Sequence, residues 1–263
     1  MSAPLLSLSG ISRHFGALKA VDDVSIDVPT GARHALIGPN GAGKSTLFRL
    51  VTGSMPVSSG TVTLGGSDIT RLPEFRRARR GISQTLQHSS LFLSQTVQQN
   101  VLLAAQRQYG TRHAIVPREQ AAARERARAL LADVGLEGRA GTPVSALSHG
   151  ERRQLEVAVA LACQPRLLLL DEPAAGMSPA ESARLVELLK SLPESVTVVI
   201  VEHDLEVVFA LATSVTVLHL GRVLLTGSPD EVRASAAVQE AYLGTGRGSL
   251  FLDMAEPAHL EVS

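Results

Sequence analysis

The sequence predicts an α/β protein with a mainly parallel sheet that helices cover on both faces. Two runs, RLLLL at residues 166–170 and VTVVIV at residues 196–201, have the length of strands and are almost wholly apolar. A helical pattern separates them. Continuously apolar strands that alternate with helices are typical of parallel sheets buried on both sides.

The first part of the chain is predicted to contain more strands. Val24, Ile26 and Val28 alternate with polar residues, as in a half-buried strand. The other elements expected here are a short buried strand at HALIG (residues 34–38), a helix from about Gly43 to Gly53, and a hairpin around Gly65-Gly66.

Several helices are predicted from the residues that begin them. Ser148 is followed by Glu151 in a capping-box pattern, in which both satisfy amide donors at a helix start. Gly150 and the two arginines after Glu151 also suit an anion site, because an exposed helix N-terminus binds anions. The remaining predicted elements are a helix start at Thr96 and Gln99, a helix from Pro117 to near Gly135, a helix capped by Ser178 with Pro179 and Glu181, a hairpin in VTVLHLGRVLLTG, a helix at SPDEV, and an irregular tail from about Gly246.

Composition excludes several classes of protein. The 263 residues are 44% hydrophobic with a formal net charge of +0, which argues against general binding to nucleic acid. Residues 1–10 do not resemble a signal peptide, and no apolar run is long enough to span a membrane. The single Cys163 fits a reducing compartment, and we expect it to be a small core residue. We expect RLPEFRRARR, residues 71–80, to form a solvated basic face.

A phosphate-binding loop is predicted at GPNGAGKST, which matches G-x-x-x-x-G-K-[ST] between a strand and a helix. Backbone N–H groups of such a loop surround phosphate oxygens, while Lys44 would reach the β- and γ-phosphates and the Ser45 hydroxyl would bind Mg²⁺. A chance Gly-rich turn would not need this strand and helix context. The predicted nucleotide-binding residues are Gly38, Pro39, Asn40, Gly41, Ala42, Gly43, Lys44, Ser45 and Thr46.

Polar residues after the two apolar strands supply candidates for catalysis. Asp171 follows RLLLL and would hold Mg²⁺ at the carboxyl end of its strand, where ligands bind in open α/β sheets. Glu172 would accept the proton of an attacking water. Alone this acidic pair could be a solvated helix cap, but the upstream phosphate loop favours catalysis.

Two further side chains are candidates. His203 follows VTVVIV and is predicted to contact the γ-phosphate, with a bystander histidine as the alternative. Gln87 in QTLQH could orient water or bind Mg²⁺, and it could equally be a surface glutamine.

These elements, in this order, make the chain resemble the ATP-binding subunit of an ABC transporter over about residues 5–244. The resemblance implies an ATPase that uses ATP and Mg²⁺ and couples hydrolysis to transport. It also implies a P-loop NTPase core with a mainly parallel sheet, an N-terminal antiparallel β subdomain, and an α-helical subdomain inserted at about residues 88–158. Residues 245–263 would be a C-terminal tail.

Particular residues take their roles from this resemblance. LSHGE, residues 147–151, is similar to the family's LSGGQ signature, which implies that Ser148 and Gly150 bind the γ-phosphate of ATP held by a partner subunit. Phe15 is implied to stack on adenine, with a core Phe as the alternative. Ser178 stands where the family often has an Asp that crosses the dimer interface, which leaves open how the two ATP sites communicate.

QTLQ, LSHGERRQLEVA and VIVEHDLEVV resemble most the importer ATPases for branched-chain amino acids, and their relatives for urea and short amides. This implies a second, different ABC ATPase subunit, two membrane permease subunits and, indirectly, an external substrate-binding protein as partners, without nucleic acid. The chain would then lie at the cytoplasmic face of a bacterial inner membrane. The ATPase of lipopolysaccharide export is the alternative. A soluble ABC ATPase of DNA repair or translation is disfavoured, because the chain has neither long coiled-coil insertions nor a second cassette.

The run from Gly81 to Gln106 contains no Asp, Glu, Lys or Arg. One interpretation is a buried part of the core. The other is a protein–protein interface, whose centre is depleted of charge. We expect Leu91, Phe92 and Leu93 to help form a groove for a short cytoplasmic helix of the permease.

Overall fold

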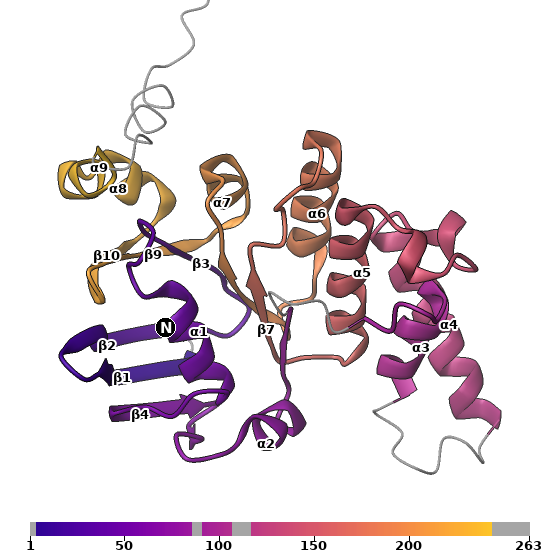
Figure 1. Ribbon diagram of the computed structural model, residues 1–263, viewed down its shortest axis with the longest axis horizontal. Helices are drawn as coiled ribbons and strands as arrows, with labels where there is room; N and C mark the ends of the chain where they lie inside the picture. Colours follow the sequence, from indigo (N-terminus) through magenta and orange to yellow (C-terminus); the bar gives the residue numbers. More distant parts are fainter. Residues whose placement is uncertain (1–3, 86–90, 107–116, 244–263) are drawn as a thin grey trace, which may run out of the picture.

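A computed structural model of the chain describes residues 4–85, 91–106 and 117–243, and Figure 1 shows their arrangement. The strands of these residues form two sheets. The larger sheet contains β3 (Arg33–Ile37), β6 (Ile82–Gln84), β7 (Leu167–Asp171), β8 (Thr197–Val201), β9 (Ser214–His219) and β10 (Arg222–Gly227). The smaller sheet contains β1 (Pro4–Phe15), β2 (Leu18–Pro29), β4 (Ser59–Leu64) and β5 (Ser67–Asp68).

The larger sheet confirms the predicted parallel core. Its order is β10-β9-β3-β8-β7-β6, and every pair is parallel except the β9–β10 hairpin at one edge. All residues of β3, β7 and β8 are buried, as their continuous apolar sequences predicted.

The smaller sheet is antiparallel and packs against the larger one through the helix that follows β3. Its order is β2-β1-β4-β5. Helix α1 (Lys44–Thr52) contributes Leu47 and Leu50 to a buried cluster that contains residues of both sheets, including Leu8 of β1 and Leu169 of β7. The predicted strand at Val24–Val28 and the hairpin at Gly65-Gly66 are therefore both confirmed.

The remaining helices pack mainly around the other face and one end of the larger sheet. Three of them, α3 (Val97–Gln106), α4 (Pro117–Asp133) and α5 (His149–Ala162), lie together at the right of Figure 1. The rest are α2 (Glu74–Arg79), α6 (Pro179–Ser191), α7 (Leu205–Leu211), α8 (Pro229–Ala234) and α9 (Ala236–Leu243), with short 3-10 turns η2 (Glu137–Arg139) and η3 (Val144–Ala146).

The predicted helix starts are confirmed by their hydrogen bonds. Ser148 and Glu151 form a capping box at the start of α5, and Ser178 and Glu181 form one at α6. Thr96 and Gln99 exchange the same pair of bonds before α3. Ser228 and Glu231 cap α8 in SPDEV. The sequence patterns did not predict β1, α2, β6, α7 or α9.

The prediction of a solvated basic face at residues 71–80 is wrong for one arginine. Arg71, Arg76, Arg79 and Arg80 are exposed, but Arg77 is only 2% exposed. Its guanidinium donates to the carbonyls of Leu50 and Val51 at 2.7 and 2.8 Å. Those carbonyls lie in the last turn of α1, where a helix leaves acceptors without intrahelical partners, so Arg77 caps the helix that begins at the phosphate loop.

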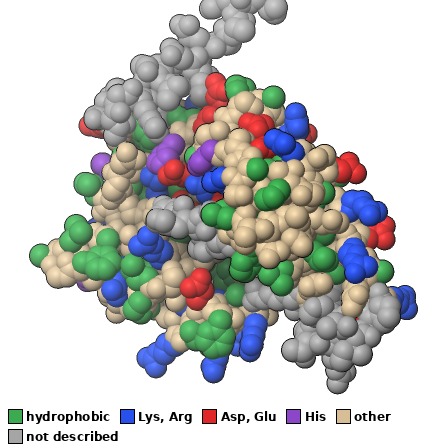
Figure 2. All heavy atoms as spheres, turned by 45° about the vertical axis from the view of Figure 1, so that its right-hand side comes forward, with side chains coloured by type: hydrophobic (Ala, Val, Ile, Leu, Met, Phe, Trp, Pro, Cys, Tyr) green, Lys and Arg blue, Asp and Glu red, His purple; other side chains and the backbone are tan. Residues whose placement is uncertain are grey.

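Cys163 also differs from its prediction. It is the residue that ends α5, it is only half-buried, and it borders a groove rather than filling the core. Among the described residues, no helix combines the length and the hydropathy that a membrane span requires. Charged side chains of both signs are spread over the face that Figure 2 shows, in agreement with the net charge of +0.

Candidate functional site

The parallel strands bring the candidate residues to one edge of the larger sheet. The phosphate loop follows β3, His203 follows β8 closely, and Asp171 ends β7. β8 lies between β3 and β7, and all three run in the same direction. Their carboxyl ends therefore meet, which is where ligands bind in open α/β sheets.

The phosphate loop lies so close to neighbouring backbone that side chains at two of its glycines would collide with it. A Cβ at Gly38, which has φ +150°, would lie 2.2 Å from the Leu218 carbonyl oxygen. A Cβ at Gly43, which has φ +104°, would lie 2.4 Å from the Ala20 carbonyl oxygen. These positions need glycine both for the backbone conformation and for the close approach.

Lys44 and the start of α1 face the inside of this loop. Gly43 is the N-cap of α1 and provides no side-chain cap. The Lys44 side chain is buried, and its ammonium donates to the carbonyls of Gly38 and Pro39 at 2.6 and 2.9 Å. A cation held beside the N-terminus of a helix is suited to bind phosphate.

Phe15 lies at the exposed end of the β1–β2 hairpin, where it pairs with Leu18. It is 44% exposed, so the alternative of a core phenylalanine is wrong. The Arg13 guanidinium covers the ring at 4.7 Å from its centre, within the range of a cation–π contact. The sequence did not point to this partner.

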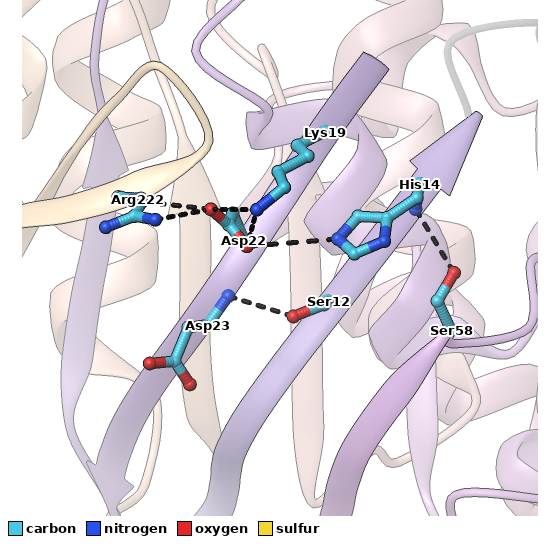
Figure 3. Close-up of polar contacts among 7 residues, drawn as sticks. All are labelled: Ser12, His14, Lys19, Asp22, Asp23, Ser58 and Arg222. Atoms are coloured by element: carbon cyan, nitrogen blue, oxygen red, sulfur yellow. Dashed lines mark hydrogen bonds and ion pairs between the residues drawn. The ribbon is translucent and has the colours of Figure 1, made fainter. Parts of the chain in front are cut away.

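A cluster of charges around Asp22 joins the β1–β2 hairpin to β10, as Figure 3 shows. Asp22 of β2 accepts from Arg222 at 2.6 Å and from Lys19 at 3.3 Å, and His14 lies 3.8 Å away. The hydrogen bond from Arg222 is the main reason that the pKa of Asp22 lies below its ordinary value.

The backbone continues this connection to the phosphate loop. Asp22 N–H donates to the Gly221 carbonyl at 2.8 Å, and Gly221 N–H donates to the Ala42 carbonyl at 3.1 Å. The hairpin with Phe15, the β9–β10 turn and the phosphate loop are therefore joined in one hydrogen-bonded unit.

The catalytic candidates Glu172 and His203 are in contact. Glu172 Oε1 lies 2.6 Å from His203 Nε2, and both side chains are partly exposed. Asp171 is buried, and its N–H donates to the Thr85 hydroxyl at 3.2 Å. Thr85 is a site residue that the sequence did not reveal, although it lies in the QTLQ segment.

The described residues suit a magnesium ion shared with a nucleotide. They contain no group of three or more His, Cys, Asp or Glu side chains that could hold a metal by themselves. Mg²⁺ is commonly held by one or two carboxylates together with substrate phosphates and water. The Asp171 carboxylate and the Ser45 hydroxyl are oxygen donors of the kind Mg²⁺ prefers. Gln87 lies outside the described residues.

Ser148 and Gly150 belong to a different region of the molecule. They lie at the start of α5, which Figure 1 shows well apart from α1, with α6 and β7 between them. The start of α6 is adjacent, because a Cβ at Gly150 would lie 3.2 Å from the Glu181 carboxylate. Ser178 caps α6 as predicted. The chain thus has two helix starts suited to anions, and they do not face one common site.

A groove of about 410 Å³ opens between α2, β6, α3 and α5. Leu91 and Phe92 line it as predicted, whereas Leu93 is exposed and is not part of the lining. Asn100 holds this segment, accepting from Phe92 N–H at 2.8 Å. Val97 and Val101 of the same uncharged run are buried in the core, so the buried-core interpretation is confirmed for these two residues, and the interface at Leu91 and Phe92 stays a prediction.

Comparison with known proteins agrees with this geometry. Residues 21–175 match the protein family described as "ABC transporter", and residues 222–247 match the one described as "Branched-chain amino acid ATP-binding cassette transporter". The chain is 38% identical to the high-affinity branched-chain amino acid transport ATP-binding protein LivG of Salmonella typhimurium, over 93% of this chain and 99% of that protein. It is 36% identical to BraF of Pseudomonas aeruginosa, which carries the same description, with the same coverage.

Solved structures give the same result. A nucleotide-free ATP-binding cassette of an ABC transporter superposes with a TM-score of 0.79 and 28% identity, covering 92% of this chain and 99% of that one. A dimeric ATP-binding cassette in a post-hydrolysis state, bound to ADP and Pi, superposes with a TM-score of 0.75 and 25% identity, covering 85% and 98%. The chain belongs to the ATP-binding cassette family of ABC transporters and is an ATPase of that family.

Proposed function

We propose that this chain is the ATP-hydrolysing subunit of an ABC importer for branched-chain or other hydrophobic amino acids. The observation that carries the choice of substrate is the match of residues 222–247 to the branched-chain amino acid cassettes, together with the identity to LivG along almost the whole chain. The match of residues 222–247 favours this class over lipopolysaccharide export.

In this proposal the chain's own nucleotide lies between the Phe15 hairpin and the phosphate loop. The adenine stacks on Phe15. The Lys44 ammonium binds the β- and γ-phosphates in place of the Gly38 and Pro39 carbonyls that it contacts in the free chain. Ser45 and Asp171 would hold Mg²⁺, which would supply positive charge that neutralises the phosphate oxygens.

Glu172 and His203 act at the γ-phosphate end of the nucleotide. Glu172 accepts a proton from the attacking water, and His203 donates a hydrogen bond to the γ-phosphate. Because these side chains now contact each other at 2.6 Å, ATP must separate them before either can act. Gln87 would contribute to the same site by orienting water or binding Mg²⁺.

The signature at Ser148 and Gly150 contacts ATP held by a second subunit. The separation of α5 from α1 supports this arrangement, because the two helix starts cannot hold one nucleotide within one chain. The partner is a second ABC ATPase subunit, inferred to be a different chain. Residues 5–244 would form the ATPase domain, with the helical part at about 88–158, and the tail at 245–263 lies outside the described residues.

The groove beside Phe92 receives a short cytoplasmic helix of one of two permease subunits at the inner face of a bacterial membrane. Its lining is mainly apolar, and Phe92 is 55% exposed in the free chain. An exposed aromatic side chain at the edge of an apolar groove is typical of an interface anchor. An external binding protein would deliver the amino acid to the permease.

The proposal is tested by co-purification and transport. Phe92→Asp is expected to reduce recovery of the permease with this chain and to abolish ATP-driven leucine uptake into proteoliposomes, while ATP binding by the free subunit stays normal. Leu224→Asp is the matched control, because Leu224 is also exposed but lies on β10, at the opposite edge of the sheet from β6. Full complex recovery and uptake with Phe92→Asp would contradict the groove assignment, and uptake of urea rather than leucine by the wild-type complex would contradict the substrate class.

A further inference from the structure

Glu202 connects the two segments that carry the catalytic candidates. It follows β8 directly, it is only 4% exposed, and both of its carboxylate oxygens accept hydrogen bonds from backbone. Oε1 accepts from Ala174 N–H at 2.8 Å, and Oε2 accepts from His203 N–H at 3.1 Å. Ala174 belongs to the loop that begins at Glu172, so one side chain holds both loops.

These contacts close a ring. The chain runs from Glu172 to Ala174, a hydrogen bond leads to Glu202, the chain continues to His203, and the His203 imidazole returns to the Glu172 carboxylate at 2.6 Å. The side chains of Glu172 and His203 can rotate when ATP enters. The backbone that carries them is held by the hydrogen bonds of Glu202 to the N–H groups of Ala174 and His203.

Glu172 needs such support because its backbone is strained. Its φ is +49°, a left-handed conformation that is unfavourable for a residue with a side chain and persists only where the surrounding structure holds it. Residues at the end of β8 hold this conformation through two hydrogen bonds. Glu172 N–H donates to the Val201 carbonyl at 2.9 Å, and Ala174 N–H, two residues later, donates to the Glu202 carboxylate.

The chemistry of this position explains why it is a carboxylate. Two donors from different segments need two acceptor oxygens, and an ionised carboxylate has two whereas an amide has one. Burial makes the carboxylate costly and raises the pKa of Glu202, while the backbone donors lower it. A group that only filled the space would not need this buried charge.

We propose that Glu202 is a positioning residue for ATP hydrolysis, which keeps Glu172 aimed at the attacking water and His203 aimed at the γ-phosphate. The proposal rests on the roles assigned above to Glu172 and His203. Glu202 itself touches neither nucleotide nor water in this scheme.

The test compares Glu202→Ala and Glu202→Gln in the full-length chain, with ATP affinity and turnover measured separately. Leaving a buried N–H without an acceptor costs enough that kcat is expected to fall about 10- to 100-fold in Glu202→Ala. Glu202→Gln keeps one acceptor oxygen, and its kcat is expected to lie between those of Glu202→Ala and the wild type. The Kd for ATP is expected to stay within about twofold, because the phosphate loop is unchanged. Glu206→Gln is the matched control, since Glu206 is an exposed carboxylate in α7.

A second readout separates positioning from folding. With ¹⁵N-labelled histidine, the His203 ring resonances are expected to move in Glu202→Gln at a fixed pH, since the contact with Glu172 is disturbed. Unchanged ring resonances and a normal kcat per ATP-binding subunit in Glu202→Gln would overturn the proposal, even if Glu202→Ala does not fold. Glu172→Gln is measured in parallel: near-normal turnover there would overturn the role of Glu172 itself, whereas normal turnover confined to the Glu202 variants overturns only the positioning role.

Discussion

The starts of α1 and α5 are both suited to bind a phosphate, yet they are built in opposite ways. Gly43 begins α1 in a left-handed conformation, with no side-chain cap and no acidic residue in the first turn. Ser148 begins α5 with a complete capping box, and Glu151 places a carboxylate in the first turn. A helix N-terminus attracts anions through its amide donors and dipole, but at the start of α5 the N–H groups of Ser148 and Glu151 already donate to acceptors within the chain.

Because of this difference, a phosphate would meet different groups at the two helix starts. Around α1 the buried Lys44 lies inside a glycine loop of the same chain, where its ammonium contacts the carbonyls of Gly38 and Pro39. At α5 a phosphate must approach a carboxylate that accepts from Ser148 N–H at 2.8 Å and pairs with Arg139 at 2.8 Å. We therefore expect α1 to hold the chain's own ATP and α5 to contribute only when a second subunit presents a γ-phosphate.

The largest expected effect is at α1. Lys44→Ala removes the cation that faces the β- and γ-phosphates, and loss of a charge-assisted contact of this kind is expected to weaken ATP binding about 100-fold or more. Titration with a fluorescent ATP analogue measures it. Lys190→Ala is the control, because Lys190 is exposed on α6 and pairs with Glu187. Affinity within about threefold of wild type would show that α1 does not depend on its lysine.

A smaller and different effect is expected at α5. Ser148→Arg is expected to leave ATP binding by the isolated chain within about twofold of wild type, since the phosphate loop is untouched, and to reduce ATP-dependent dimerisation and hydrolysis about tenfold. Sedimentation and single-turnover hydrolysis measure these quantities. Ser228→Arg breaks a capping box of the same type at α8 and controls for loss of a cap. A large loss of monomer affinity in Ser148→Arg would mean that α5 serves the chain's own nucleotide.

Glu151→Gln should make α5 more like α1. The amide oxygen can still accept from Ser148 N–H, but the negative charge beside the helix start is lost and Arg139 is released from its ion pair. ATP-dependent dimerisation is expected to tighten about two- to fivefold, the range of a single exposed charge near a helix terminus. Glu231→Gln makes the same change at α8. Weaker dimerisation with Glu151→Gln alone would show that the carboxylate helps the partner's ATP to bind.

The smallest effect is in the pH dependence of the two helix starts. The hydrogen bond from Ser148 N–H is the main cause that lowers the pKa of Glu151 from 4.5. A carboxyl whose pKa is lower in the folded state stabilises the fold above its unfolded pKa, and this contribution is lost as pH falls through the folded pKa. At pH values below about 4.5, the first amides of α5 are therefore expected to lose protection from hydrogen exchange. The first amides of α1 are expected to keep theirs, because the first turn of α1 contains no carboxylate that could be protonated. Equal loss of protection at both helices would contradict this.

Much of the fold followed from patterns that are local in sequence. The apolar strands β7 and β8 and the capping boxes of α5, α6 and α8 depend on residues within a few positions of each other, so spacing and residue type suffice to predict them. Short or weakly patterned elements were missed, such as the six-residue α2 and the three-residue β6. Packing holds these elements, and their own sequences carry little signal.

The candidate site divides in the same way. The phosphate loop, Asp171, Glu172 and His203 were identified from motifs and from their places after strands. The groove beside Phe92 was expected from the absence of charge between Gly81 and Gln106, but the loss of Leu93 from its lining was not. A lack of charged residues indicates that a segment contributes to an interface or to the core, but it does not predict the direction of each side chain, such as that of Leu93.

The phosphate-loop motif, the parallel strands that bring the catalytic candidates to one edge of the sheet, and the helix starts could all be predicted from the sequence, because each depends on neighbours along the chain. Contacts between distant segments were visible only in the folded chain: Arg77 caps α1 through Leu50, 27 residues away, and Glu202 accepts from Ala174 N–H, 28 residues away. Likewise, Arg222 pairs with Asp22 across 200 residues beside Phe15. The sequence alone does not distinguish a charged side chain on the surface from one in the core. A charged side chain can be buried only where backbone groups of distant segments form the hydrogen bonds that water would otherwise provide.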